Sequence, residues 1–285
     1  MIIIVDSNAI AYQSLYAQMG NLTHKNMSVS VIFGFLKTIL SIFKKYGSNN
    51  LVFAWDSKKS NRKMVFEDYK KGRRKDLSKE EEEKLHEGFI QFAALRMVVL
   101  PSMGFVNNFR KVGYEGDDII ASVTHRTRET EVVVVSSDHD FYQLLGSGIV
   151  MYDPKKRKEL DTAWFEERFA ITPLQWAQVL SIAGCTSDNV PGVPGVGIKT
   201  AIKYLKGELK KDSKPYKNIK NHKEEIELYD SLVRLPLQGT GKFEIKENRL
   251  SEKSFWDNFS YYGFHSFMKD DMWSDWVDLI GDVPF

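Results

Sequence analysis

The chain has 285 residues, of which 42% are hydrophobic and 13% aromatic, so it can bury a proper core and is not intrinsically disordered. It carries 40 Lys and Arg against 38 Asp and Glu, a near balance that hides strong local segregation of charge. The single cysteine, Cys185, excludes an intrachain disulfide framework and a cysteine-based zinc site. No stretch reaches transmembrane length, and the apolar run 2–5 lacks the basic flank of a signal peptide, so we expect a cytoplasmic protein without a membrane partner.

Aspartates follow three apolar runs that are predicted to be buried strands. These are residues 1–5 followed by Asp6, residues 51–55 followed by Asp56, and residues 131–135 followed by Asp138 and Asp140. Open α/β sheets bind ligands at the carboxyl edge of their strands. Any one of these acids could instead be a helix cap or a turn residue. Their repetition indicates that acids from separate parts of the chain converge at one edge.

Three carboxylates, Glu115, Asp117 and Asp118, stand at the head of a predicted apolar helix. Acids favour helix N-termini, where the free amides and the dipole stabilise negative charge, and this is sufficient to explain an isolated acidic pair. Three acids in one turn repel one another and need a counter-charge, for which a divalent cation is the usual choice. Without cysteine ligands, the sequence predicts a hard cation held by oxygen atoms.

Two segments are strongly basic. Residues 58–75 contain nine Lys and Arg against two acids, and residues 199–223 contain nine Lys against two acids. A solvated charged face is the default explanation. The first segment, however, follows a candidate acidic site, and the second follows a glycine-rich turn at 191–197, which permits close backbone approach and presents a helix N-terminus to a phosphate. This placement favours binding to a nucleic-acid backbone. The turn lacks the Gly-Lys-Ser/Thr ending of a nucleotide-binding loop.

The order of elements predicts an α/β fold with a mostly parallel central sheet and helices on both faces. Further helices are expected at 29–43 and from the end of the charged stretch 79–84 to about Val99, strands at 105–106 and 146–152, and a basic hairpin at 154–161. A mainly helical region follows, with a short strand around Phe243. We expect an N-terminal α/β core in residues 1–160, a C-terminal helical region in residues 161–285, and a monomer.

These motifs in combination resemble those of the flap endonuclease and 5′-nuclease family, especially the phage enzymes and the 5′-nuclease domain of bacterial DNA polymerase I. The resemblance covers the chain from Asp6 to about Ala201. Its motifs are Asp6, Trp55-Asp56, Tyr69-Lys70-Lys71-Gly72-Arg73, Tyr114-Glu115-Gly116-Asp117-Asp118, Ser137-Asp138-His139-Asp140 and Ser187-Asp188-Asn189. The resemblance implies a PIN-like nuclease core, a helical arch at about 58–100 and a helix-three-turn-helix at about 174–206.

The function implied by the resemblance is a structure-specific 5′-nuclease with flap endonuclease and 5′-3′ exonuclease activity. It would hydrolyse DNA phosphodiester bonds with two or more divalent ions, Mg²⁺ or Mn²⁺, in replication, repair and RNA primer removal. The implied substrates are branched, nicked or 5′-ended duplex DNA and RNA–DNA hybrid. In the family the arch selects a free 5′ strand, and the glycine-rich turn grips the duplex, often with a bound K⁺ ion.

The resemblance also assigns roles to individual residues. The first metal group is Asp6, Asp56, Glu115, Asp117 and Asp118, and the second is Asp138, Asp140 and Asp188. The catalytic residues are Lys70, Arg73 and Asp118. The nucleic-acid-binding residues are Lys70, Arg73, Arg74, Gly192, Gly195, Gly197 and Lys199.

One position departs from the family pattern. Cys185 follows Gly184 where the family usually has aspartate, and a neutral thiol is a poor ligand for Mg²⁺. We therefore expect the second metal group to be weaker or to bind its ion through water. Two alternatives remain open, a DNA-binding scaffold that has lost catalysis and a PIN-type ribonuclease. The turn around Lys199 argues against the ribonuclease, since a compact RNA-cleaving domain does not need it.

The last four residues, 282–285, read Asp-Val-Pro-Phe. They resemble the acidic, Pro-Phe-ending tips by which bacterial single-stranded-DNA-binding proteins recruit partners, and this predicts docking onto a replication protein. The favoured interpretation of the C-terminal segment is a final helix docked by Trp273 and Trp276 with a frayed end, and the docking tail is the smaller hypothesis.

Overall fold

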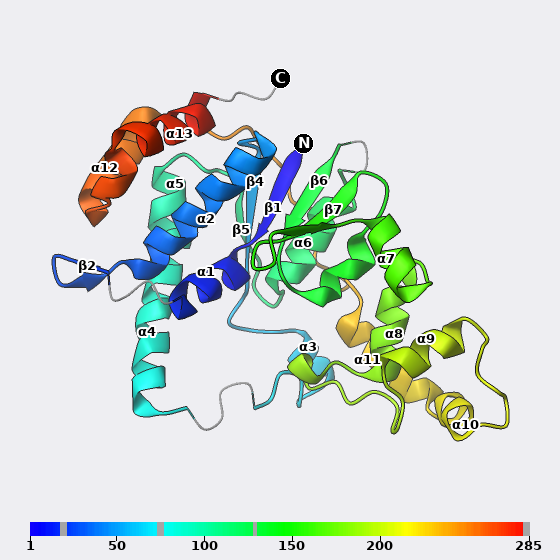
Figure 1. Cartoon of the computed structure of the whole chain (residues 1–285). Coiled ribbons are helices and arrows are strands. Elements are labelled where there is room, and N and C mark those ends of the chain that lie inside the picture. Colours follow the sequence, from blue (N-terminus) through cyan, green and yellow to red (C-terminus); the bar gives the residue numbers. More distant parts are fainter. Residues whose placement is uncertain (18–21, 73–76, 128–129, 282–285) are drawn as a thin grey trace.

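A six-stranded sheet forms the centre of the computed structural model, which describes residues 1–17, 22–72, 77–127 and 130–281 (Figure 1). The strands lie in the order β5-β4-β1-β6-β7-β8. Their bounds are β1 Ile2–Asp6, β4 Leu51–Trp55, β5 Asn108–Arg110, β6 Val132–Val135, β7 Ile149–Asp153 and β8 Lys158–Leu160. All neighbouring pairs are parallel except β7 and β8, which form the predicted hairpin. The prediction of a mostly parallel sheet is confirmed.

Both faces of this sheet are buried. Ile3 and Val5 of β1 lie in one apolar cluster, and Ile2 and Ile4 lie in another, because successive side chains of a strand point to opposite faces. The helices of the first cluster are α1 Ser7–Tyr16, α2 Ser30–Tyr46, α4 Lys79–Ala94, α12 Glu252–Tyr262 and α13 Asp270–Gly281. Those of the second are α6 Gly116–Thr124, α7 Thr162–Phe169, α8 Trp176–Ala183, α9 Ile198–Leu205, α10 Lys214–Asn221 and α11 Lys223–Val233. Helices on both faces were expected and are confirmed.

The shorter elements complete the chain. They are β2 Thr23–His24, β3 Met27–Ser28, α3 Arg62–Val65, η1 Leu95–Val99, α5 Leu100–Ser102, η2 His139–Leu144, η3 Pro173–Gln175, η4 Thr186–Asp188 and η5 His265–Met268. The helix predicted to run from the charged stretch 79–84 to about Val99 is present as α4 with its continuation η1, and it already includes the charged stretch. Its start is defined by a capping box, in which Ser78 accepts from the Glu81 amide and the Glu81 side chain accepts from the Ser78 amide.

The segment expected to form the arch, 58–100, contacts two different parts of the fold. Before the undescribed residues 73–76, the Lys70 amide donates to the Asp188 carbonyl at 2.8 Å, and Asn189 donates to the Asp68 carbonyl at 2.7 Å. After them, α4 packs against α1 and α2. The two described ends of this segment therefore lie on the helical C-terminal side and on the α1 side, respectively (Figure 1). The predicted site residues Arg73 and Arg74 lie outside the described residues.

The structure differs from the prediction at two expected strands. No strand is formed at Phe243 within residues 234–251, and the strand expected at 105–106 lies at Asn108–Arg110 instead. Helices α12 and α13 return to the first apolar cluster beside α2 (Figure 1), so the boundary at residue 160 stays a prediction. Among the described residues, no helix is both long and apolar enough to cross a bilayer. The tail 282–285 lies outside the described part of the chain.

Candidate active site

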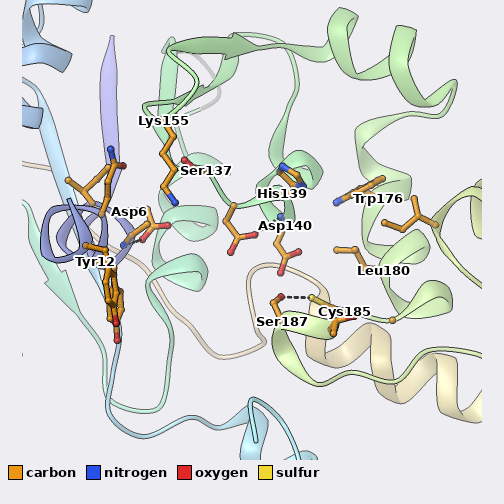
Figure 2. A pocket seen from close by; sticks show the side chains of 18 of the residues that line it. Asp6, Tyr12, Ser137, His139, Asp140, Lys155, Trp176, Leu180, Cys185 and Ser187 are labelled. Atoms are coloured by element: carbon orange, nitrogen blue, oxygen red, sulfur yellow. Dashed lines mark hydrogen bonds between the residues drawn. The ribbon is translucent and has the colours of Figure 1, made fainter. Parts of the chain in front are cut away.

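A cleft of about 910 Å³ opens at the carboxyl edge of the sheet. Its lining comes from α1, from η2, from the β7–β8 turn through Lys155, and from the turn that follows α8. Figure 2 shows Asp6 on one side of the cleft and Asp140, Cys185 and Ser187 on the other. This is the arrangement that the repeated strand-then-acid pattern predicts.

Asp6 ends β1 and caps α1, and its carboxylate is held by two hydrogen bonds. The Ala9 amide donates to Oδ1 at 3.0 Å, and the Ser136 hydroxyl donates to Oδ2 at 2.7 Å. Burial raises the pKa of Asp6 to about 7 in spite of these bonds, and repulsion from Asp56 and Asp138 adds to the effect. Asp6 therefore lies in a crowded group of acids.

Asp117 belongs to the same group. Burial raises its pKa well above the usual value, and repulsion from Asp6 and Asp138 adds to this. The positive charge of Lys70 acts to lower the pKa of Asp117. Asp56, which also repels Asp117, accepts a hydrogen bond from the Gly116 amide at 2.8 Å and so lies against the first turn of α6. Asp6, Asp56, Asp117 and Asp138 thus form one electrostatically coupled set.

Asp140, Cys185 and Asp188 form a second set, in which one ligand atom of each lies within 4.8 Å of the others. Burial raises the pKa of Asp140 to about 8, with further repulsion from Asp138 and Asp188. Burial also raises the pKa of the Cys185 thiol to about 11, and its Sγ lies 3.0 Å from the Ser187 hydroxyl. The carboxylates fit a hard divalent cation such as Mg²⁺, whereas a thiol suits softer metals. The fit to Mg²⁺ is therefore good in the first set and poorer in the second.

Lys70 and Tyr69 connect Glu115 to Asp188. The Lys70 ammonium donates to Glu115 Oε2 at 2.7 Å and lies 3.8 Å from Asp188 Oδ2. The Tyr69 hydroxyl lies 2.7 Å from Asp188 Oδ2 and 3.0 Å from Glu115 Oε2. Burial raises the pKa of Tyr69, which keeps this hydroxyl a neutral donor. The structure therefore places Lys70 among the acids.

Asp118 is placed differently from the prediction. It is 0% exposed, and both of its carboxylate oxygens bind the Arg62 guanidinium at 2.7 Å. Oδ1 also accepts from the Leu237 amide at 2.8 Å, and Oδ2 accepts from the Glu115 amide at 3.0 Å. Both oxygens are occupied by buried protein donors, so the structure places Asp118 with Arg62 rather than in the cleft, and its assignment as a metal ligand and catalytic residue stays a prediction.

The glycine-rich turn between α8 and α9 has a buried part and an exposed part. Gly192 is buried with φ +68°, and an added Cβ would lie 2.3 Å from the Gly184 nitrogen, so this glycine permits the turn to pack on itself. Gly192 is therefore a packing position in this structure, and its predicted contact with nucleic acid stays a prediction. Gly195 and Gly197 are exposed, with nothing within 4 Å of an added Cβ, and Lys199 is exposed in the first turn of α9. Gly195, Gly197 and Lys199 are therefore accessible to the backbone of a nucleic-acid ligand.

Comparison with known proteins decides the family. The sequence profile described as 5′-3′ exonuclease, N-terminal resolvase-like domain, matches residues 1–170. The chain belongs to the 5′-3′ exonuclease family. A 5′-3′ exonuclease of Buchnera aphidicola subsp. Schizaphis graminum is 34% identical over 236 residues, covering 81% of this chain and 76% of that protein. The thermostable DNA polymerase I of Thermus thermophilus is 30% identical over 244 residues, which are 83% of this chain but 28% of the polymerase, so the chain spans about a quarter of that relative.

Solved structures agree with this 5′-3′ exonuclease fold. The T5 D15 protein co-crystallized with metal ions superposes with a TM-score of 0.71 at 20% identity, covering 82% of this chain and 89% of that one. Flap endonuclease-1 from Methanococcus jannaschii gives a TM-score of 0.58 at 16% identity, covering 98% and 91%. At these identities the likeness shows the fold alone, and it confirms the predicted architecture.

Seven of the eight acids predicted to bind metal are linked to one another by repulsion, by shared hydrogen-bond donors or by proximity, and Asp6, Asp138 and Asp140 among them line the cleft. The seven are Asp6, Asp56, Glu115, Asp117, Asp138, Asp140 and Asp188. Four residues of the site were missed from the sequence: Arg62, Tyr69 as a bridge, Ser136 and Lys155. Only Tyr69 carried a signal, as the residue before Lys70 in a recognised motif. Ser136 and Lys155 have no distinguishing pattern.

The raised pKa values predict how divalent ions change stability. A carboxyl whose pKa is higher in the folded than in the unfolded state lowers stability as it ionises, so Asp6 and Asp140 should destabilise the metal-free fold progressively from about pH 4 to about pH 8. A bound divalent ion offsets that repulsion and requires ionised ligands. We expect excess Mg²⁺ to raise the melting temperature over that in EDTA more at pH 8 than at pH 5, as measured by scanning fluorimetry. An equal increment at both pH values would contradict this assignment.

Proposed function

We propose that the chain is a structure-specific 5′-nuclease, a flap endonuclease and 5′-3′ exonuclease that hydrolyses DNA phosphodiester bonds with divalent metal ions. The observation that carries the proposal is the clustering of carboxylates from five separate segments, of which Asp6, Asp138 and Asp140 line the cleft, in a chain that also has a glycine-rich turn with exposed glycines and a basic helix. A role in cytoplasmic DNA replication and repair, including RNA primer removal, follows from this activity.

The carboxylates divide between two ion positions. Asp6, Asp56, Glu115 and Asp117 would hold the first ion, and Asp140 and Asp188 the second, with Asp138 between the two sets because it repels both Asp6 and Asp140. When bound, Mg²⁺ or Mn²⁺ at such a site lowers the pKa of the attacking water and stabilises the leaving oxygen.

Lys70 supplies positive charge at the same place. Its ammonium lies between Glu115 and Asp188, at 2.7 and 3.8 Å, so it is held within reach of a phosphate that enters among the acids. A fixed cation at this position stabilises the negative charge that grows on the phosphate during hydrolysis. We propose the same contribution for Arg73, with Arg74 contacting the strand.

The substrate class follows from the exposed basic surface. Lys199, Lys203 and Lys206 are exposed along α9 and its end, and the open Gly195 and Gly197 precede them. Exposed lysine side chains and glycine backbone can contact the phosphates of a nucleic acid without recognising its base sequence. We therefore propose branched, nicked or 5′-ended duplex DNA and RNA–DNA hybrid as substrates. The carbonyl groups of the turn 191–197 are suitable oxygen ligands for K⁺.

Substrate comparison in one assay tests this proposal. The purified chain is incubated with a labelled 5′-flap DNA, a nicked duplex and a single-stranded RNA, each in EDTA, Mg²⁺ or Mn²⁺. We expect metal-dependent cleavage of the two DNA substrates near the junction or the 5′ end. DNA binding without cleavage at any Mg²⁺ or Mn²⁺ concentration would support the non-catalytic scaffold, and preferential cleavage of the RNA would support the PIN-type ribonuclease.

Cys185 gives a prediction about metal requirement. Replacing it with Asp adds an oxygen ligand beside Asp140 and Asp188, so we expect half-maximal cleavage at a lower Mg²⁺ concentration. Cys185→Ser, which is similar in size and stays neutral, should leave the Mg²⁺ dependence close to that of the wild type. If the Asp and Ser variants have the same Mg²⁺ dependence, Cys185 does not face the second ion.

Two further proposals concern assembly. We propose that the chain acts as a monomer and that residues 282–285 dock onto a replication protein. A pull-down with and without these four residues tests the docking, and unchanged capture of replication proteins after the deletion would exclude it.

A further inference from the structure

Arg62 is a buried cation that connects three separate segments of the chain. Its side chain is 1% exposed, and its guanidinium binds both oxygens of Asp118 at 2.7 Å. Its Nε donates to the Leu232 carbonyl at 2.7 Å, at the end of α11, and its Nη1 lies 3.7 Å from Glu115 Oε2. Arg62 therefore joins three segments: the base of the predicted arch, the acidic turn of α6 and the segment that leaves α11.

The partners of Arg62 extend this connection. Asp118 accepts from the Leu237 amide and from the Glu115 amide, so it ties the acidic turn to residues 232–237. Gln143 holds the same segment by donating to the Val233 carbonyl at 3.1 Å and accepting from the Leu235 amide at 2.9 Å. It also donates to the Asp140 carbonyl at 2.9 Å. Both acid-bearing turns are thus fastened to one short segment, 232–237.

We propose that Arg62 is a positioning residue for the nuclease reaction, which fixes Glu115 and Lys70 relative to the other acids; this rests on the function proposed above. A buried ion pair is weak evidence for stability, because two charges must be desolvated and a well-packed apolar pair often serves equally well. What the pair does supply is fixed geometry among three segments. Only the planar, five-donor guanidinium can bind two carboxylate oxygens and a carbonyl together, and a lysine ammonium cannot reproduce this fork.

Arg62 is close in sequence to Tyr69 and Lys70, which contact the acids Glu115 and Asp188. It lies eight residues before Lys70, and the intervening Tyr69 packs near its guanidinium, with the ring centroid 6.0 Å away. A shift of α3 would therefore move Tyr69 and Lys70 away from Glu115 and Asp188. Displacement of a positioned group by about 1 Å can cost about a hundredfold in rate.

The test compares Arg62→Lys with Arg234→Lys, because Arg234 forms a similar two-point bond to Asp230 at 2.7 Å but on the surface of one helix end. Single-turnover cleavage of flap DNA is measured across Mg²⁺ concentrations, flap binding is measured in Ca²⁺, and the folded fraction is measured by melting. We expect Arg62→Lys to lower the maximal rate about tenfold to a hundredfold and to raise the Mg²⁺ requirement, with DNA affinity changed less than about twofold. Arg234→Lys should match the wild type. A wild-type rate and Mg²⁺ dependence in Arg62→Lys, or a loss no greater than the unfolded fraction, would overturn the proposal.

Two additional measurements cover the cases in which Arg62→Lys does not fold or the wild type does not cleave. If Arg62→Lys does not fold, the neutral pair Arg62→Gln/Asp118→Asn removes both buried charges, and we expect it to fold and to show the same loss of rate; wild-type kinetics there would overturn the proposal. If the wild type does not cleave flap DNA, the proposed nuclease function fails by itself. Mn²⁺ affinity, measured from the free-ion paramagnetic resonance signal, then tests Arg62 alone, with a severalfold loss expected in Arg62→Lys and an unchanged affinity contradicting it.

Discussion

Replacing Asp117 with Asn is expected to abolish metal-dependent cleavage while leaving the fold intact. Asp117 belongs to the coupled set with Asp6, Asp56 and Asp138, and an amide supplies no charge to hold a divalent ion there. We expect the cleavage rate to fall about a thousandfold or more, at or beyond the upper end of what one electrostatic group contributes. The measurement is single-turnover cleavage of a labelled 5′-flap DNA at saturating Mg²⁺.

The same substitution should stabilise the metal-free protein. Burial and neighbouring charge disfavour the ionised form of Asp117, so a neutral amide of similar shape removes repulsion. We expect a higher melting temperature in EDTA at pH 8 and unchanged flap binding in Ca²⁺. Retained cleavage in Asp117→Asn would show that this acid does not hold a catalytic ion.

Replacing Asp118 with Ala is expected to have its main effect on stability. The substitution leaves the Arg62 guanidinium buried without its carboxylate and leaves two amides without an acceptor. Removing one partner of a buried ion pair costs about 3–5 kcal/mol, because the remaining charge is uncompensated. Denaturant unfolding in EDTA measures this loss.

The exposed pair of Arg234 and Asp230 provides the control. Both side chains are partly solvated, and the bond joins neighbouring turns, so Asp230→Ala should cost less than about 1 kcal/mol. Equal losses in Asp118→Ala and Asp230→Ala would show that removing Asp118 does not leave an uncompensated buried charge on Arg62. Asp117 and Asp118 are adjacent in sequence, yet only the substitution at Asp118 should cause a large loss of stability.

The central sheet could be predicted because its strands are buried on both faces. Such strands appear in the sequence as continuous apolar runs. The three strongest runs form β1, β4 and β6, and an aspartate follows closely after each of them. The strand expected at Phe243 is wrong because the signal was a lone aromatic. Phe243 packs against Phe109 of β5, with ring centroids 5.2 Å apart, and is partly buried without joining the sheet.

The candidate site was harder to predict where it depends on ion pairs and packing contacts between residues that are far apart in the sequence. The sequence shows that Asp117 and Asp118 are both acidic, but not that the second turns inward to an arginine 56 residues earlier. Arg62 itself stands in a basic run where one buried cation cannot be distinguished from eight others. Likewise, the spacing of the glycines does not reveal that Gly192 is buried against Gly184 while Gly195 and Gly197 stay exposed.

Mn²⁺ binding by the metal-free protein tests most directly whether these acids form a metal site. The free Mn²⁺ signal is titrated by paramagnetic resonance against the wild type, Asp117→Asn and the neutral-pair variant Arg62→Gln/Asp118→Asn. We predict saturable binding by the wild type that Mg²⁺ displaces, loss of the tighter binding in Asp117→Asn, and weakened but detectable binding in the neutral-pair variant. The absence of saturable Mn²⁺ binding by the wild type, or equal binding by Asp117→Asn, would contradict a metal site built on Asp6, Asp56, Asp117 and Asp138.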